Sequence, residues 1–275
     1  MNKIEIRFVI FTLSMLMLTG MNVVQAQPAA VPETRPGRLV GYLPSDQLPH
    51  ALSLVPPAPT DESAAHAWEL FVIQNARALR GSARWQQAII DNNLEFPDAA
   101  GTFSCALNAP VSQEQTPYLY QLLRRTLTDA GLATYSAKDH YQRTRPFVVN
   151  GDPICAEGAE DRLRNDGSYP SGHTSIGWAW ALILSELAPD RSQQIFARGL
   201  SFGDSRLVCN VHWPMDVVQG QIIGAATVAR LHGDELFRSD LEHARAELAA
   251  VRARGLPPTR DCAEEAAALA IPVQR

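Results

Sequence analysis

The sequence predicts an all-α protein that folds as a compact, single-domain helical bundle. From residue 61 onward, apolar residues recur at three- and four-residue spacing, which is typical of amphipathic helices. Strand signals are nearly absent, because short β-branched runs such as Val148-Val149 stand alone. The segment from Thr174 to Leu187 is apolar nearly all round, which in a soluble protein indicates a central helix surrounded by others.

Capping residues and prolines indicate where the helices begin. Asp61 can cap a helix whose apolar face consists of Trp68, Phe71, Val72, Ala76 and Leu79. Ser171 can cap the central helix, and Asp190 can cap the helix that follows it. Further helices are expected at residues 84–92, 116–131, 214–231 and 234–254.

Residues 1–26 are predicted to be a signal peptide. Lys3 and Arg7 form a basic region, residues 8–18 are mainly apolar, and Val24-Gln25-Ala26 supplies small residues where a signal peptidase cleaves. An uncleaved membrane anchor is the alternative interpretation. No cysteine lies near the cleavage site, which argues against a lipoprotein. The expected location is the periplasm of a Gram-negative type of cell.

The rest of the chain divides in two by composition. Residues 27–59 are rich in Pro and Ala and are expected to form an extended leader on the surface of the domain, which comprises residues 60–275. The net charge of −5, without any run of Lys or Arg, argues against a nucleic-acid partner. No later apolar run approaches the roughly 20 residues that span a bilayer, so we expect no membrane association after cleavage.

Four cysteines, Cys105, Cys155, Cys209 and Cys262, favour disulfide bonds in an exported chain. Three pairings are possible. If the motifs described below share one pocket, a Cys155–Cys209 bond would fix its rim, and Cys105–Cys262 would tie the ends of the domain. A zinc site is the competing interpretation, but no CxxC or HxxxH spacing supports it.

The first motif contains Lys138 and Arg145-Pro146. Two residues seven apart lie on one face of a helix, and Pro146 should end that helix at Arg145. Both cations would then lie near a loop at a helix end. A solvated basic face is the alternative.

The second motif, Pro170-Ser171-Gly172-His173, is predicted to be a turn that leads into the central helix. Ser171 can cap this helix, and Gly172 allows a ligand to approach the backbone closely. The exposed amides at such a helix end attract anions. The alternative is an ordinary N-cap beside a surface histidine.

The third motif contains Ser205-Arg206, His212 and Asp216. Pro214 suits the first turn of a helix, which places His212 just before that helix and Asp216 inside its first turn. The carboxylate can therefore bind one imidazole nitrogen and leave the lone pair of the other nitrogen facing a pocket. A purely structural His–Asp pair is the alternative.

Together the three motifs form a known signature: Lys, six residues, Arg-Pro; then Pro-Ser-Gly-His; then Ser-Arg, five residues, His, three residues, Asp. All eleven positions agree. The chain thus resembles the type 2 phosphatidic acid phosphatase superfamily, in its bacterial class A non-specific acid phosphatase branch. The resemblance covers most of the mature domain. It implies the acid phosphatase/vanadium haloperoxidase fold and favours a homo-oligomer.

The resemblance also implies a role for each matched residue. His212 would be the nucleophile that forms a phosphohistidine, Asp216 would orient it, and His173 would be the general acid. The phosphoryl oxygens would be bound by Lys138, Arg145, Ser171, Gly172 and Arg206. Positioning and charge stabilisation account for most of the catalysis of phosphoryl transfer, so this set of residues needs no metal or other cofactor.

The sequence therefore predicts a secreted, metal-independent acid phosphatase that acts on small phosphate monoesters at mildly acidic pH. A vanadium-dependent haloperoxidase is the main rival, because that family has a similar site. Diphosphate hydrolysis and phosphate transfer to an alcohol remain open on the same site. A lipid phosphatase would need several membrane spans, and a phosphate-binding protein would not need His173, His212 and Asp216. Substrate specificity should come from the loops after Pro146 and before Pro170.

Overall fold

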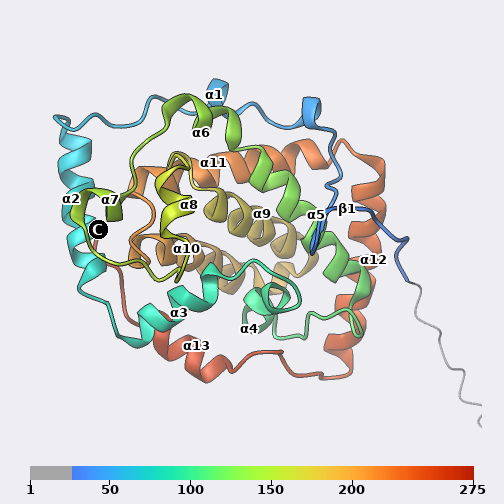
Figure 1. Cartoon of the computed structure of the whole chain (residues 1–275). Helices are drawn as coiled ribbons and strands as arrows, with labels where there is room; N and C mark the ends of the chain where they lie inside the picture. The colour runs from blue at the N-terminus through green and yellow to red at the C-terminus, as the bar shows by residue number, and fades with distance from the viewer. Residues whose placement is uncertain (1–26) are drawn as a thin grey trace, which may run out of the picture.

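Helix α9 (Gly172–Leu187) lies at the centre of the computed structural model, which describes residues 27–275 (Figure 1). Three long helices pack directly against it: α5 (Pro117–Leu132), α10 (Ser192–Val208) and α11 (Pro214–Leu231). Helix α12 (Glu235–Ala253) covers α5 from outside. The predicted signal peptide falls on residues 1–26, outside the described residues.

Shorter elements surround these helices. They are η1 (Ser45–Gln47), α1 (Ala51–Leu54), α2 (Ala64–Arg77), α3 (Ala83–Asn92), η2 (Asp98–Phe103), α4 (Ser104–Leu107), α6 (Tyr135–Tyr141), α7 (Pro146–Asn150), α8 (Glu160–Arg164), η3 (Pro189–Arg191) and α13 (Cys262–Leu269). Within residues 27–275, the sheet consists of β1 (Glu33–Arg35) and β2 (Arg38–Leu39), which pair antiparallel. The predicted all-α fold is confirmed. None of the helices described in this range is both long and apolar enough to cross a membrane.

The central position of α9 follows from its apolar surface. Trp180, Ile183 and Leu184 are fully buried, and the Trp180 indole donates a hydrogen bond to a carbonyl group of α5. Helix α11 approaches α9 closely at two glycines. A Cβ atom at Gly220 would lie 2.6 Å from the Ser171 carbonyl oxygen, and one at Gly224 would lie 2.5 Å from that of Ser175. This contact brings the start of α11 next to the start of α9.

Residues 27–59 contain the small sheet, η1 and α1, and they contribute to the core through buried side chains such as Leu43 and Val55. The carboxylate of Asp129 on α5 accepts hydrogen bonds from the backbone N–H groups of Tyr42 and Leu43, at 2.9 and 3.0 Å. Burial raises the pKa of Asp129 to about 6. The domain boundary at residue 60 stays a prediction.

Two expected caps are wrong. Ser63, rather than Asp61, caps α2, since its side chain accepts a hydrogen bond from the N–H of His66. Asp190 lies within η3 and pairs with Arg252 of α12 instead of capping α10. The expected apolar face of α2 is confirmed only in part: Val72 and Ala76 are fully buried, whereas Trp68 and Phe71 are 37% and 54% exposed. Apolar spacing alone could not tell which stripe of α2 faces the core.

The structure contains two disulfide bonds. Cys105 is joined to Cys262, and Cys155 to Cys209, so both bonds follow the expected pairing. The first ties α13 to α4, and the second ties the end of α10 to the segment between α7 and α8. The prediction of disulfide bonds is confirmed.

Candidate active site

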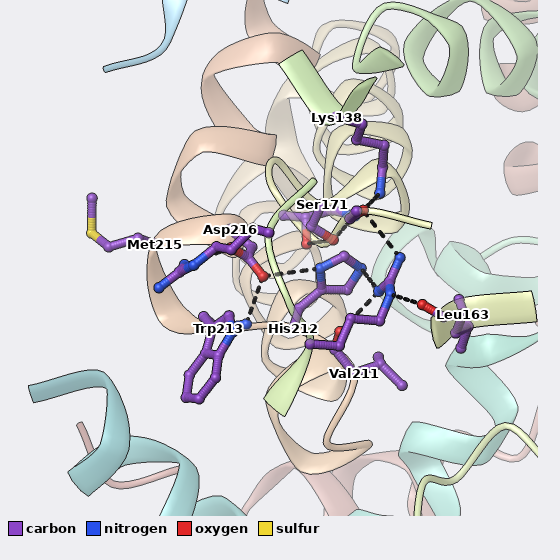
Figure 2. A network of polar contacts seen from close by, with 12 residues as sticks. Lys138, Leu163, Ser171, Val211, His212, Trp213, Met215 and Asp216 are labelled. Atoms are coloured by element: carbon purple, nitrogen blue, oxygen red, sulfur yellow. Dashed lines mark hydrogen bonds and ion pairs between the residues drawn. The ribbon is translucent and has the colours of Figure 1, made fainter. Parts of the chain in front are cut away.

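The three sequence motifs meet beside the N-terminus of α9. Figure 2 shows His212 with Asp216 on one side of its ring and, on the other, Leu163 and Val211, whose carbonyl groups accept hydrogen bonds from Arg145. The backbone N–H of Ser171 donates to the Asp216 carbonyl at 2.9 Å, which joins the second motif to the third. All the residues of the site come from loops or from the ends of helices, with Lys138 in the last turn of α6 and Arg206 in the last turn of α10.

His212 is held in one tautomer by its two neighbours. Nδ1 lies 3.3 Å from the Asp216 carboxylate, and Arg145 donates to Nε2 at 3.1 Å. A guanidinium group has no acceptor, so the Nε2 lone pair receives this bond and the ring proton lies on Nδ1. The backbone N–H of Trp213 also donates to Asp216, which fixes the carboxylate at the first turn of α11. His212 therefore presents the lone pair of Nε2 on the side where Arg145 lies.

Arg143 extends this arrangement and was not recognised in the sequence. It donates to Asp216 at 2.8 Å and to the two Glu69 carboxylate oxygens at 3.1 and 2.5 Å. Glu69 and Asp216 are fully buried, and Glu69 also accepts from the N–H of Met215 at 3.1 Å. Glu69 of α2 and its partner Arg143 therefore anchor the Asp216 carboxylate, which holds His212, and also the first turn of α11, which carries Asp216. The only sequence signal was the Arg-x-Arg-Pro spacing.

Lys138 and Arg145 lie close together, but not on one helix face as expected. Helix α6 ends at Tyr141, because Gln142 adopts a left-handed conformation with φ of 42°. Arg145 has an extended backbone, and Pro146 opens α7 instead of ending the earlier helix. Proline fits the first turn of a helix, where its missing N–H costs nothing. The two cations therefore meet through a loop.

The segment 163–167 provides partners for both cations. Arg145 donates to the carbonyl groups of Leu163 and Asp166, at 3.0 and 2.9 Å, and to the Asp166 carboxylate at 2.8 Å. Lys138 donates to the carbonyl of Gly167 at 2.5 Å and lies 3.6 Å from the Asp166 carboxylate. Asp166 was not recognised as a site residue in the sequence.

Asn92, at the end of α3, connects two further residues of the site, Arg206 and His173. Its side-chain oxygen accepts from Arg206 at 2.9 Å, and its backbone oxygen lies 3.1 Å from Nε2 of His173. A carbonyl group only accepts, so Nε2 carries the proton in the neutral ring. Arg206 is almost fully buried, whereas His173 and Gly172 are partly exposed. Asn92 was also missed in the sequence.

Ser171 caps α9 as predicted. Its hydroxyl oxygen accepts from the Thr174 N–H at 3.3 Å and from the Thr174 hydroxyl at 2.9 Å. The Ser171 hydroxyl hydrogen is therefore not used in these two bonds and can be donated to a ligand. Gly172 is the first residue of the helix, where backbone N–H groups have no intrahelical partner.

Burial and mutual repulsion lower the pKa of nearly every basic group here. Burial, followed by the charge of Arg145, lowers the pKa of His212 to about 3. The same two causes lower the pKa of Lys138 to about 8. Burial and then the charge of Arg206 hold the pKa of His173 well below its usual value. Burial lowers the pKa of Arg206 to about 10. The site is thus a buried cluster of positive charge with neutral histidines, and an anion is the ligand that would relieve it.

Ser205 also belongs to the signature, but it faces away from this cluster. Its hydroxyl donates to the buried carboxylate of Asp91 at 2.6 Å, and Arg84 donates to the same hydroxyl at 2.9 Å. Asp91 also pairs with Arg198 at 2.5 Å. This second network fixes α3 against α10, and so supports Asn92 and Arg206 from behind. Among residues 27–275, no group of three or more His, Cys, Asp or Glu side chains is arranged to hold a metal ion.

Comparison with known proteins is consistent with this geometry. Residues 119–236 match the PAP2 superfamily. The chain is 39% identical over 212 residues to a non-specific acid phosphatase of Providencia stuartii. The aligned residues cover 77% of this chain and 86% of that protein. It is 42% identical to an acid phosphatase of Zymomonas mobilis (75% and 78% covered) and 40% identical to a non-specific acid phosphatase of Salmonella typhimurium (70% and 78% covered).

Proposed function

We propose that this chain, which belongs to the PAP2 superfamily and is an acid phosphatase, hydrolyses small phosphate monoesters through a phosphohistidine formed at His212. The observation that carries the proposal is the position of the His212 Nε2 lone pair. Nε2 is 3.1 Å from Arg145, the cation best placed to hold a phosphoryl group, and Asp216 is on the opposite nitrogen. A bound phosphoryl group would take the place of this Arg145–Nε2 contact and meet the nucleophile there.

The three cations would bind the phosphoryl oxygens. Lys138, Arg145 and Arg206 are each at most 4% exposed, so their charges act in a medium that water screens little. The Ser171 hydroxyl and the Gly172 amide add two neutral donors at the helix N-terminus. Charge stabilisation of this kind is the main requirement of phosphoryl transfer, and these groups supply it from the chain itself, without a metal ion.

In the first step, the Nε2 lone pair would attack phosphorus as the bond to the leaving oxygen breaks. His173 would give its proton to that oxygen. In the second step, His173 would take a proton from water, whose oxygen attacks phosphorus and releases His212 with inorganic phosphate. Asp216 stabilises the positive charge that develops on His212 in the first step.

His173 must be protonated to act as an acid, although burial and Arg206 disfavour this in the free protein. A phosphate dianion beside Arg206 would offset that cation and raise the pKa of His173. Protonation would therefore accompany substrate binding. This coupling gives a physical reason for activity at mildly acidic pH.

Rapid-quench trapping with a labelled substrate tests the assignment of the nucleophile. The wild-type protein should accumulate an acid-labile phosphoenzyme with the label on His212. The His212→Ala variant should lose this species and lose turnover by about 10⁴-fold or more, as for other nucleophile deletions. Label on His173, or label that persists in His212→Ala, would contradict the proposal.

Metal independence is tested with the same protein and excess chelator. Turnover of a chromogenic monoester should be retained, and orthovanadate should inhibit as a mimic of the transition state. Loss of turnover in chelator, restored by a divalent metal, would show that the three cations are insufficient. An assay of halide oxidation in the presence of vanadate addresses the haloperoxidase alternative.

Export to the periplasm belongs to the same proposal. The two disulfide bonds support it, because such bonds persist in oxidising compartments. Sequencing the N-terminus of the mature protein should place the cleavage after Ala26.

A homo-oligomer is also proposed, supported by the exposed apolar side chains of Trp68, Leu70 and Phe71 on α2. Light scattering on the purified protein measures its mass.

A further inference from the structure

One negatively charged side chain lies in the cation cluster where the proposed substrate would bind. The Asp166 carboxylate is 2.8 Å from Arg145 and 3.6 Å from Lys138. The two cations are 2% and 5% exposed at their side chains, whereas Asp166 is 27% exposed. A carboxylate, like a phosphoryl group, offers oxygen acceptors to a guanidinium and an ammonium group. The same cations therefore face two acidic partners.

We infer that Asp166 competes with phosphate for the same cations. Its carboxylate binds Lys138 and Arg145 in the free enzyme and leaves them when an anionic substrate binds. The inference rests on the proposed function, because it assigns the same two cations to the substrate. It adds a residue that sets substrate affinity without contacting the reacting atoms. Any anion must displace a carboxylate as well as water.

The backbone around Asp166 has contacts that do not depend on the Asp166 side chain. The Gly167 carbonyl binds Lys138, and the Ser168 N–H donates to the Arg143 carbonyl at 2.9 Å. A Cβ atom at Gly167 would lie 2.8 Å from the Lys138 carbonyl oxygen, so this chain segment is tightly packed against α6. Rotation of the Asp166 side chain toward solvent is therefore the smallest motion that frees the cations. The backbone carbonyl groups would keep Lys138 and Arg145 in place.

The alternative role for Asp166 is to position Arg145 for the substrate. The two roles predict opposite signs for one substitution. Asp166→Asn keeps the size of the side chain and an oxygen that can accept from Arg145, but removes the charge. A competitor that loses its charge should let phosphate bind more tightly, whereas a positioning residue that is weakened should let it bind less tightly.

The test measures binding of inorganic phosphate to the full mature protein by calorimetry, which needs no turnover. Asp166→Asn should bind phosphate on the order of tenfold more tightly than wild type, as expected for the loss of one partly exposed charge contact. Asp166→Ala should change affinity in the same direction. Asp161→Asn is the matched control, since it removes the same charge from an exposed position on α8 and should leave the affinity within about twofold.

Unchanged or weaker phosphate binding in Asp166→Asn would overturn the inference, and so would equal tightening in Asp161→Asn. Failure of the proposed function has a different signature. If phosphate does not bind to wild type, or binds equally well to Arg145→Ala, the cations are not the phosphate site, and both proposals fall together.

Discussion

The two histidines of the site are held in different ways. His212 is attached to Asp216, which is attached to Arg143 and through it to Glu69, and the two carboxylates are fully buried. His173 is partly exposed and donates to a backbone carbonyl, that of Asn92. Ion pairs between buried partners fix geometry, whereas a contact to a neutral carbonyl leaves the charge of the ring to its surroundings. In the proposed mechanism, His212 would thus be a fixed, neutral nucleophile, and His173 would be an acid whose protonation depends on the ligand.

Removing His173 should produce the largest change in activity that distinguishes the role of His173 from that of His212. In His173→Ala, hydrolysis of alkyl phosphates should fall by about 10²- to 10⁴-fold, the range typical of a lost general acid. Hydrolysis of nitrophenyl phosphate should fall much less, because nitrophenolate leaves without a proton. The ratio of kcat for the two substrates is the measurement. Equal losses for both would show that His173 does not protonate the leaving group.

Breaking the support behind His212 should act on stability. Arg143→Ala leaves the buried Glu69 and Asp216 carboxylates without their cation, which should lower the free energy of unfolding by about 3–5 kcal/mol. The control is Arg252→Ala, since the Arg252–Asp190 pair is 29% and 59% exposed and should be worth about 1 kcal/mol or less. Urea unfolding measures both. Similar losses in the two variants would mean that the Arg143 pairs give no special support.

The titration of Lys138 tests whether the cluster of Lys138, Arg145 and Arg206 responds to a ligand. Lys138 is the one lysine in residues 27–275, so the protein that remains after the proposed cleavage, labelled with ¹³C at lysine Cε, should give a single lysine resonance. Its titration midpoint should lie near the pKa of about 8. Lys138 is charged below this pH, so phosphate affinity should fall as pH rises through about 8.

Bound phosphate should raise that midpoint, because an anion beside Lys138 favours the charged form. Burial and the charge of Arg145, which lower the pKa of Lys138 in the free protein, would then be partly offset. A midpoint near the usual 10.5 in the free protein, unchanged when phosphate is added, would mean that Lys138 is solvated and does not belong to a buried cationic cluster.

The short-range parts of the site could be read from the sequence. A serine three residues before Thr174 caps a helix, and a carboxylate four residues after His212 reaches its ring, because the geometry of one helical turn fixes both pairs. The spacing of the three motifs also indicated the family, and the recurrence of apolar residues at three- and four-residue spacing indicated the all-α fold. These features depend on backbone geometry and on the order of residue types along the chain, and both are present in the sequence.

The long-range partners were decided only by the tertiary structure. Arg143 meets Glu69 across 74 positions, Asn92 meets Arg206 across 114, and Asp166 meets Arg145 across 21. Many arginines and carboxylates in this chain could form such pairs, and which of them do depends on how α2, α3 and the 163–167 segment pack around α9. Even Lys138 and Arg145 came together through a left-handed turn at Gln142 and not along one helix. The sequence predicted which groups act on phosphate, and the packing of the helices determined which groups hold them, because side-chain pairing between distant segments is a property of the folded chain.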